Sequence, residues 1–146
     1  MPSAADVRTT IANNFATYVA ELEQTADVWD KKPDGSADGE AAWCAREVAE
    51  HIAGSGPFFG AGIASAVGIE GPTPSRFSFP THAEGVAETK RTHGLLMDVL
   101  NQLNDEHLDI EVDHPRFGKL TVGRMTSIVE GHLLDHANQL KTLRGG

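Results

Sequence analysis

The sequence has a single cysteine, few aromatic residues and no long apolar run. Cys44 stands alone among 146 residues, so no disulfide can form within the chain, and we expect a reducing, cytoplasmic location. Aromatic residues make up only 6%, so the core must rest on Leu, Ile, Val, Ala and Met, which favours helices over a sheet. The N-terminus has no signal-peptide pattern and no segment approaches a membrane span. We therefore expect neither export nor a membrane partner.

Basic residues are also scarce. Twelve basic residues stand against 21 acidic ones, which gives a formal net charge of −9. A field of this sign repels phosphate groups, so the composition predicts no nucleic-acid partner, and it disfavours an acidic membrane surface for the same reason. The chain length suits one domain with its own core, so we expect a single domain over residues 1–146.

Apolar residues recur at steps of three and four in four segments, which predicts four helices. The predicted helices cover about residues 3–29, 40–67, 82–104 and 121–143. Two glycines and a proline in residues 54–57 predict a kink or break in the second helix. Alternation over residues 109–112 predicts a short extended ribbon. The fold class predicted is an all-α four-helix bundle, in which the long connection over residues 70–81 crosses the bundle and brings the third helix parallel to the second.

Histidines are placed on the inner faces of two of these helices. His132 and His136 are four residues apart and share the apolar stripe of the last helix, so both point into the bundle about one turn apart. His51 lies beside the apolar face of the second helix. Three inward imidazoles from two helices suit a metal site with open coordination positions. The alternative is three core histidines joined by hydrogen bonds.

Four further residues are considered for such a site, of which three are candidates for a role and one is excluded. Gln139 shares the inner stripe of the last helix and is expected to hold one imidazole by its second nitrogen. Glu47, one turn from His51, is a candidate hydrogen-bond acceptor or base, with a solvated surface position as the alternative. His93 is a candidate fourth ligand or proton relay, with an ordinary core histidine as the alternative. Cys44 is expected to be buried, and too far along its helix to share an ion with His51.

Two segments resemble signatures of the DinB/YfiT-like family. Residues 43–53 (WCAREVAEHIA) are similar to its W-x-x-x-E-[aliphatic]-x-x-H-[aliphatic] helix. Residues 114–144 contain its G-x-x-T lead and its final-helix pattern H-x-x-x-H-x-x-Q-[aliphatic]. The resemblance implies a four-helix bundle of up-down-down-up topology, often homodimeric. It also implies that the metal ligands are His51, His132 and His136.

The same resemblance implies an activity. Several characterised members of the superfamily resemble metal-dependent thiol transferases or isomerases that use bacillithiol, mycothiol or glutathione. The ion would bind the small-molecule thiol as a thiolate and hold it for attack on an electrophilic substrate. We expect Zn or Ni, with Fe or Mn as alternatives, since three imidazoles suit several divalent ions. Arg76, Arg91 and Arg124 are candidates to bind a carboxylate of the thiol.

Two other functions are compatible with the histidine pattern. One is non-haem iron chemistry, as in the sulfoxide synthases of ergothioneine biosynthesis, whose final helix resembles H-x-x-x-H-x-E; Asn138 stands at that last position here. The other is a metal-binding or stress-response protein without turnover. A closed site with a fourth protein ligand would favour that last function, whereas an open position beside a cleft would favour catalysis.

Overall fold

The protein is described by a computed structural model over residues 2–35 and 38–146. Its four helices are α1 Ala4–Glu23, α2 Ala45–Val67, α3 His82–Leu100 and α4 Val122–Leu143. The connections contain three short 3-10 helices, Ala26–Val28, Gly39–Ala42 and Asp105–Asp109, and an antiparallel hairpin of β1 Glu111–His114 and β2 Gly118–Thr121. The expected all-α class, with four helices and a small ribbon, is confirmed.

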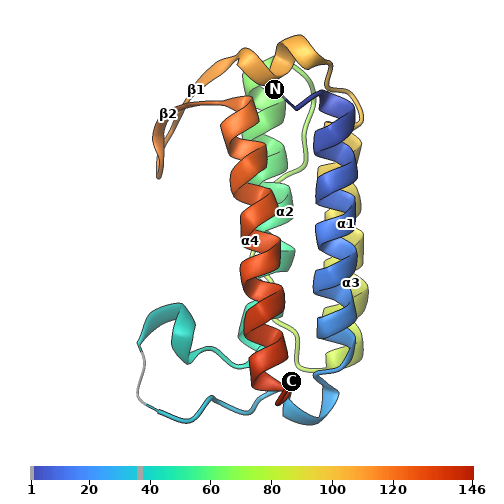
Figure 1. The fold of residues 1–146 in the computed structure, drawn as a ribbon, viewed down its shortest axis with the longest axis vertical. Coiled ribbons are helices and arrows are strands. Elements are labelled where there is room, and N and C mark those ends of the chain that lie inside the picture. Colours follow the sequence, from blue (N-terminus) through green and yellow to red (C-terminus); the bar gives the residue numbers. More distant parts are fainter. Residues whose placement is uncertain (1, 36–37) are drawn as a thin grey trace.

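The helices stand side by side along one long axis (Figure 1). The chain runs one way through α1 and α4 and the opposite way through α2 and α3, because residues 68–81 return along the bundle before α3 begins. The largest helix contacts join α2 to α3 and α1 to α4, and α2 also packs against α4. This last contact brings the histidine-bearing helices together.

Aliphatic side chains from all four helices form the core. The fully buried members include Ile11, Leu22, Val48, Ile63, Leu100 and Leu140, none of which has any exposed area. Burial of each such side chain stabilises the fold by about 1.5–3 kcal/mol relative to exposure. Cys44 is 1% exposed, as predicted. Within the described ranges, no helix is both long enough and apolar enough to cross a membrane.

The first helix ends at Glu23 rather than near Trp29, where the apolar pattern placed its end. The Thr25 hydroxyl donates to the carbonyl of Leu22 at 2.7 Å, and the chain then leaves the helix through a 3-10 turn. Trp29 is nevertheless only 6% exposed, and its Nε1 donates to the carbonyl of Phe79 at 3.0 Å. The apolar spacing continues beyond the end of the helix because Trp29 packs into the core from the turn.

The second helix begins at Ala45 instead of near Glu40. The backbone N–H of Cys44 donates to the Glu47 carboxylate at 3.2 Å, which caps the helix at this point. Glu40 lies in the preceding 3-10 helix, so the start of the second helix was predicted too early.

The predicted kink or break in α2 is also wrong, because the helix continues through Pro57 to its end at Val67. A Cβ added at Gly54 would lie 3.3 Å from the carbonyl oxygen of Ser75, and one at Gly56 would lie 3.2 Å from that of Thr92. The glycines therefore admit close packing of α3 and of the segment before it. Tertiary contacts keep this stretch helical where local propensity favours interruption.

The third helix ends at Leu100, short of the predicted Asn104. Leu103 is still buried beyond the helix end, and the Asn104 side chain accepts the N–H of His107 to begin a 3-10 helix. The fourth helix begins as predicted, because the hydroxyl of its N-cap Thr121 accepts a backbone hydrogen bond from the first turn.

Candidate metal centre

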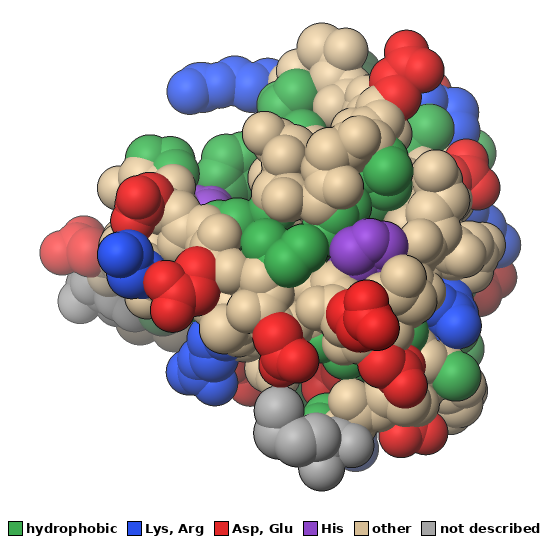
Figure 2. All heavy atoms as spheres, turned by 90° about the horizontal axis from the view of Figure 1, so that it is seen from above, with side chains coloured by type: hydrophobic (Ala, Val, Ile, Leu, Met, Phe, Trp, Pro, Cys, Tyr) green, Lys and Arg blue, Asp and Glu red, His purple; other side chains and the backbone are tan. Residues whose placement is uncertain are grey.

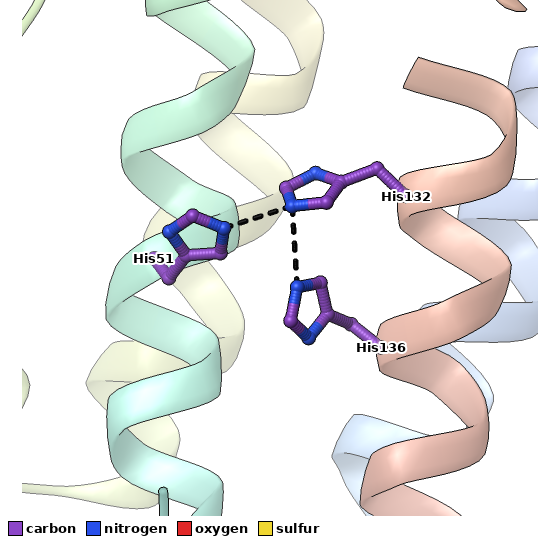
Figure 3. Close-up of side chains that lie close together, drawn as sticks. All are labelled: His51, His132 and His136. Atoms are coloured by element: carbon purple, nitrogen blue, oxygen red, sulfur yellow. Dashed lines mark hydrogen bonds between the residues drawn. The ribbon is translucent and has the colours of Figure 1, made fainter. Parts of the chain in front are cut away.

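Three histidine side chains from two helices meet between α2 and α4 (Figure 3). His51 extends from the second turn of α2, and His132 and His136 extend toward it from adjacent turns of α4. One ring nitrogen of each lies within 4.8 Å of the other two. The Nε2 atoms of His51 and His132 are 2.8 Å apart, and those of His132 and His136 are 3.2 Å apart. The predicted cluster of these three residues is therefore present.

The hydrogen bonds of Gln139 determine which nitrogen of His136 carries the ring proton. Gln139 donates its amide N–H to the carbonyl of Glu40 at 2.7 Å, which leaves its Oε1 facing Nδ1 of His136 at 2.7 Å. An amide oxygen only accepts, so Nδ1 carries the proton. The neutral ring then presents an unprotonated Nε2 to the cluster. The predicted contact between Gln139 and an imidazole is thus present.

Burial keeps two of the rings neutral at physiological pH. Burial, followed by the charges of His136, His51 and Arg116, lowers the pKa of His132 to about 3. Burial and then His136 likewise lower the pKa of His51. The neutral imidazole is the form that binds a metal ion, so acid protons do not compete for these ligands near pH 7.

The cluster fits a divalent transition-metal ion. Three Nε2 atoms that approach one another need positive charge between them, and the proton of one ring can be shared with only one neighbour. Ligands of a tetrahedral ion at 2.0–2.1 Å lie about 3.3 Å from one another. The two Nε2 separations that involve His132, 2.8 and 3.2 Å, are close to that value, and the remaining pair lies within 4.8 Å.

Aromatic rings form a wall beside the cluster. The Trp43 ring centroid lies 5.0 Å from that of His51 and 6.2 Å from that of His136. The Phe59 centroid lies 6.4 Å from that of His132. Rings in these positions keep water from the inner side of the cluster, which strengthens electrostatic interactions there.

The outer side of the cluster opens into a cavity of about 1050 Å³. His51 and His132 line its wall, so a ligand in the cavity can reach the point where the imidazoles meet. Phe58 and Phe117 also line the cavity, and each is 41% exposed. Large exposed aromatic side chains beside a concave site are typical of a small-molecule binding surface.

Three arginines line the same cavity, namely Arg76, Arg116 and Arg124. No ion pair joins any of them to a carboxylate within residues 2–35 and 38–146. Free guanidinium groups beside an open cavity suit a bidentate anion such as a carboxylate or phosphate. Arg91, also a candidate from the sequence, pairs with Glu88 and does not line the cavity.

Two other candidates from the sequence lie apart from the cluster. Glu47 caps the start of α2 and pairs with Lys32. The His93 ring stacks on that of Phe15 with centroids 3.6 Å apart, and burial lowers the pKa of His93 to about 4. His93 and His132 both line an internal void of about 10 Å³, but His93 contributes no atom to the histidine cluster.

Two charged residues at the site were not predicted from the sequence. Arg116 lies in the hairpin turn between β1 and β2, and Glu40 lies in a short 3-10 helix with its Oε1 3.3 Å from Nε2 of His136. Both residues lie in irregular connections, where no periodicity marks an inward side chain. The one signal for Arg116 was its place within residues 114–144, which resemble the final signature of the family.

Comparison with known proteins agrees with this architecture. A family model described as the DinB superfamily matches residues 9–140. No curated protein matches the chain by sequence. The fold is similar to that of the colibactin self-resistance protein ClbS, crystallised in complex with a double-stranded DNA. The TM-score is 0.67 at 16% identity, and the alignment covers 100% of this chain and 98% of ClbS.

The prediction that nucleic acid is excluded as a partner is wrong, because ClbS, which has a similar fold, is seen in complex with double-stranded DNA. Net charge is a sum over the whole surface, whereas phosphate binding depends on local charge. Here a net charge of −9 coexists with three arginines at one cavity. Basic and acidic side chains also lie interspersed over the end of the molecule in Figure 2.

Proposed function

The chain belongs to the DinB superfamily, and from that premise we propose that it is a metal-dependent transferase or isomerase that uses a low-molecular-weight thiol. The observation that carries the proposal is the opening of the histidine cluster into a large cavity lined by free arginines. A divalent ion held by His51, His132 and His136 would lower the pKa of a coordinated thiol. Zn or Ni is the proposed ion, with Fe or Mn as alternatives.

The proposed reaction forms a carbon–sulfur bond. The thiolate sulfur attacks an electrophilic carbon of the second substrate, the leaving group departs with its bonding electron pair, and the thiol proton passes to solvent. Phe58 and Phe117 supply apolar surface for the electrophile beside the histidines. Thioether formation from bacillithiol, mycothiol or glutathione and a chlorinated nitroaromatic compound tests the proposal directly. Absence of product with all three thiols, in protein loaded with Zn or Ni, would overturn it.

Arg116 is proposed to bind the carboxylate of the thiol. Its charge contributes to the lowered pKa of His132 and His51, which places it near the cluster as well as in the cavity. Arg116→Gln is therefore expected to raise KM for the thiol about tenfold with a smaller change in kcat, because a charge-assisted hydrogen bond contributes about 1.5–3 kcal/mol. Steady-state kinetics at varied thiol concentration measure this. The control is Arg91→Gln, which lies outside the cavity lining; an equal rise in KM there would refute the assignment.

A second candidate function is the binding of double-stranded DNA, favoured by the cavity arginines and by the fold shared with ClbS. Three phosphate contacts predict that the logarithm of the binding constant falls with the logarithm of salt concentration with a slope of about −3. Arg124→Gln should reduce that slope by about one unit without changing sequence preference. Fluorescence anisotropy of a labelled duplex measures both quantities. No binding at low salt would eliminate this candidate.

The open cavity also bears on the other functions considered. A metal-binding protein without turnover is expected to enclose its ion, whereas this cluster faces a large cavity, which supports catalysis.

We also propose the up-down-down-up topology of the family, which the helix directions in Figure 1 support. Homodimer formation, a single domain and a cytoplasmic location stay predictions.

A further inference from the structure

A carboxylate lies beside the histidine cluster although it belongs to neither histidine-bearing helix. Glu40 lies in the 3-10 helix Gly39–Ala42, and its Oε1 is 3.3 Å from Nε2 of His136. The Glu40 side chain is 49% exposed and lines the large cavity, whereas that of His136 is 6% exposed. The carboxylate therefore reaches the cluster from its solvent side and contacts it at His136.

Gln139 connects the backbone of Glu40 to the ring of His136. The amide nitrogen of Gln139 donates to the Glu40 carbonyl, and its amide oxygen accepts from Nδ1 of His136, both at 2.7 Å. One side chain thus holds the 3-10 helix and orients the imidazole at the same time. Partners of this kind, which bind the far nitrogen of a ligating histidine, commonly set the geometry of metal sites.

The approach of Glu40 to His136 brings two electron-pair donors together. Since Nδ1 of His136 directs its proton to Gln139, Nε2 of the neutral ring has only a lone pair to present. The carboxylate oxygen of Glu40 is also an acceptor, so the 3.3 Å contact is favourable only when positive charge, as a metal ion or as a second proton on the ring, lies between the two atoms. A divalent ion on the three histidine nitrogens supplies that charge, and carboxylate oxygens bind Zn at about the same distance as imidazole nitrogens.

We propose that Glu40 is an exchangeable fourth ligand of the ion held by His51, His132 and His136. The inference rests on the metal centre of the proposed function and adds a ligand that lies outside the histidine pattern. A carboxylate is a harder ligand than a thiolate, so a thiol cosubstrate displaces it from Zn or Ni. Because Glu40 lies on a short 3-10 helix at the cavity, it can withdraw while α2 and α4 keep their positions.

Cobalt substitution of the full-length protein tests this ligand without any assay of turnover. Co²⁺ affinity is measured by competition with a chelator, and its visible spectrum reports the number and type of ligands. Glu40→Gln is expected to weaken Co²⁺ binding about 10–100-fold and to shift the visible bands. Asp135→Asn is the matched control, because it removes the same charge from the same cavity and is expected to leave affinity and spectrum unchanged.

Titration with a thiol adds a second readout. The wild type and Glu40→Gln should converge on one Co²⁺ spectrum when thiol is saturating, because Glu40 has then left the ion in both. Equal Co²⁺ affinity and spectra in wild type and Glu40→Gln would overturn the role of Glu40 and leave the three-histidine centre intact. An equal effect of Asp135→Asn would also overturn it, in favour of a general field effect. No Co²⁺ binding by the wild type would overturn both the ligand and the centre.

Discussion

His132→Ala is expected to remove the bound metal ion from a protein that otherwise purifies with close to one ion per chain. His132 is central to the cluster, since its Nε2 lies 2.8 Å from that of His51 and 3.2 Å from that of His136. Changes to residues that merely support a ligand reduce metal affinity about 10–100-fold, so loss of one of the three histidine ligands should cost more than about 100-fold. Elemental mass spectrometry of protein prepared without a metal-affinity resin measures the metal content.

The matched control is His93→Phe, which removes a different part-buried histidine and preserves an aromatic ring against Phe15. This variant is expected to retain its metal, because His93 contributes no atom to the cluster. Thermal unfolding supplies an independent readout: metal at about a thousand times its Kd should stabilise the wild type by about 4 kcal/mol, and His132→Ala by far less. A wild type that binds none of Zn, Ni, Fe and Mn after reconstitution would refute the metal centre. The histidines would then be residues joined by hydrogen bonds.

The metal-free protein is expected to lose about 4 kcal/mol of stability between pH 7 and pH 4. Burial lowers the pKa of His93 to about 4 and that of His132 to about 3, whereas histidines of the unfolded chain titrate near the ordinary value of 6.5. Between these values the unfolded chain binds more protons than the folded one, so stability falls as pH falls. The contribution is complete above about pH 6.5 and is lost as pH falls toward the folded pKa values. Urea unfolding at a series of pH values, with a chelator present, measures the slope.

His93→Phe separates this effect from the metal site. Phe does not titrate and can keep the stack with Phe15, so the variant should show a flatter dependence of unfolding free energy on pH than the wild type. The difference should be about 2 kcal/mol between pH 7 and pH 4, since one pKa unit corresponds to about 1.4 kcal/mol and part of the ring remains in contact with solvent. Parallel pH profiles for the two proteins would contradict the assignment of the acid sensitivity to His93.

The two predictions concern neighbouring but distinct parts of the bundle. His132 and His93 both line one internal void of about 10 Å³, which is barely large enough for a single water molecule. The hydroxyl of Thr89 lines the same void and has no hydrogen-bond partner among the described residues. A larger side chain at this void is therefore expected to disturb the ring of His132, which is why the control uses a Phe of similar shape.

Local chemistry explains which features of the fold could be predicted from the sequence. The four amphipathic segments bury one stripe each, so their apolar spacing predicted four helices, and the hydroxyl of Thr121 marked the start of α4. The ends of α1 and α3 were predicted too late, because Trp29 and Leu103 are buried from turns that continue the apolar spacing. Residues 54–57 were misjudged because local propensity contains no information about the neighbours that pack against them.

The residues of the histidine cluster could also be predicted from the sequence only in part. The spacing of His132 and His136 places both rings on one face of any helix that contains them, because this follows from 3.6 residues per turn alone. His51 joins them only because α2 and α4 pack together, and its selection from the sequence relied on the family resemblance as well as on its apolar neighbours. Arg116 and Glu40 reach the site from a hairpin turn and a 3-10 helix. Periodicity reports how a segment faces its own core, whereas the meeting of segments distant in sequence depends on tertiary packing, which no local pattern encodes.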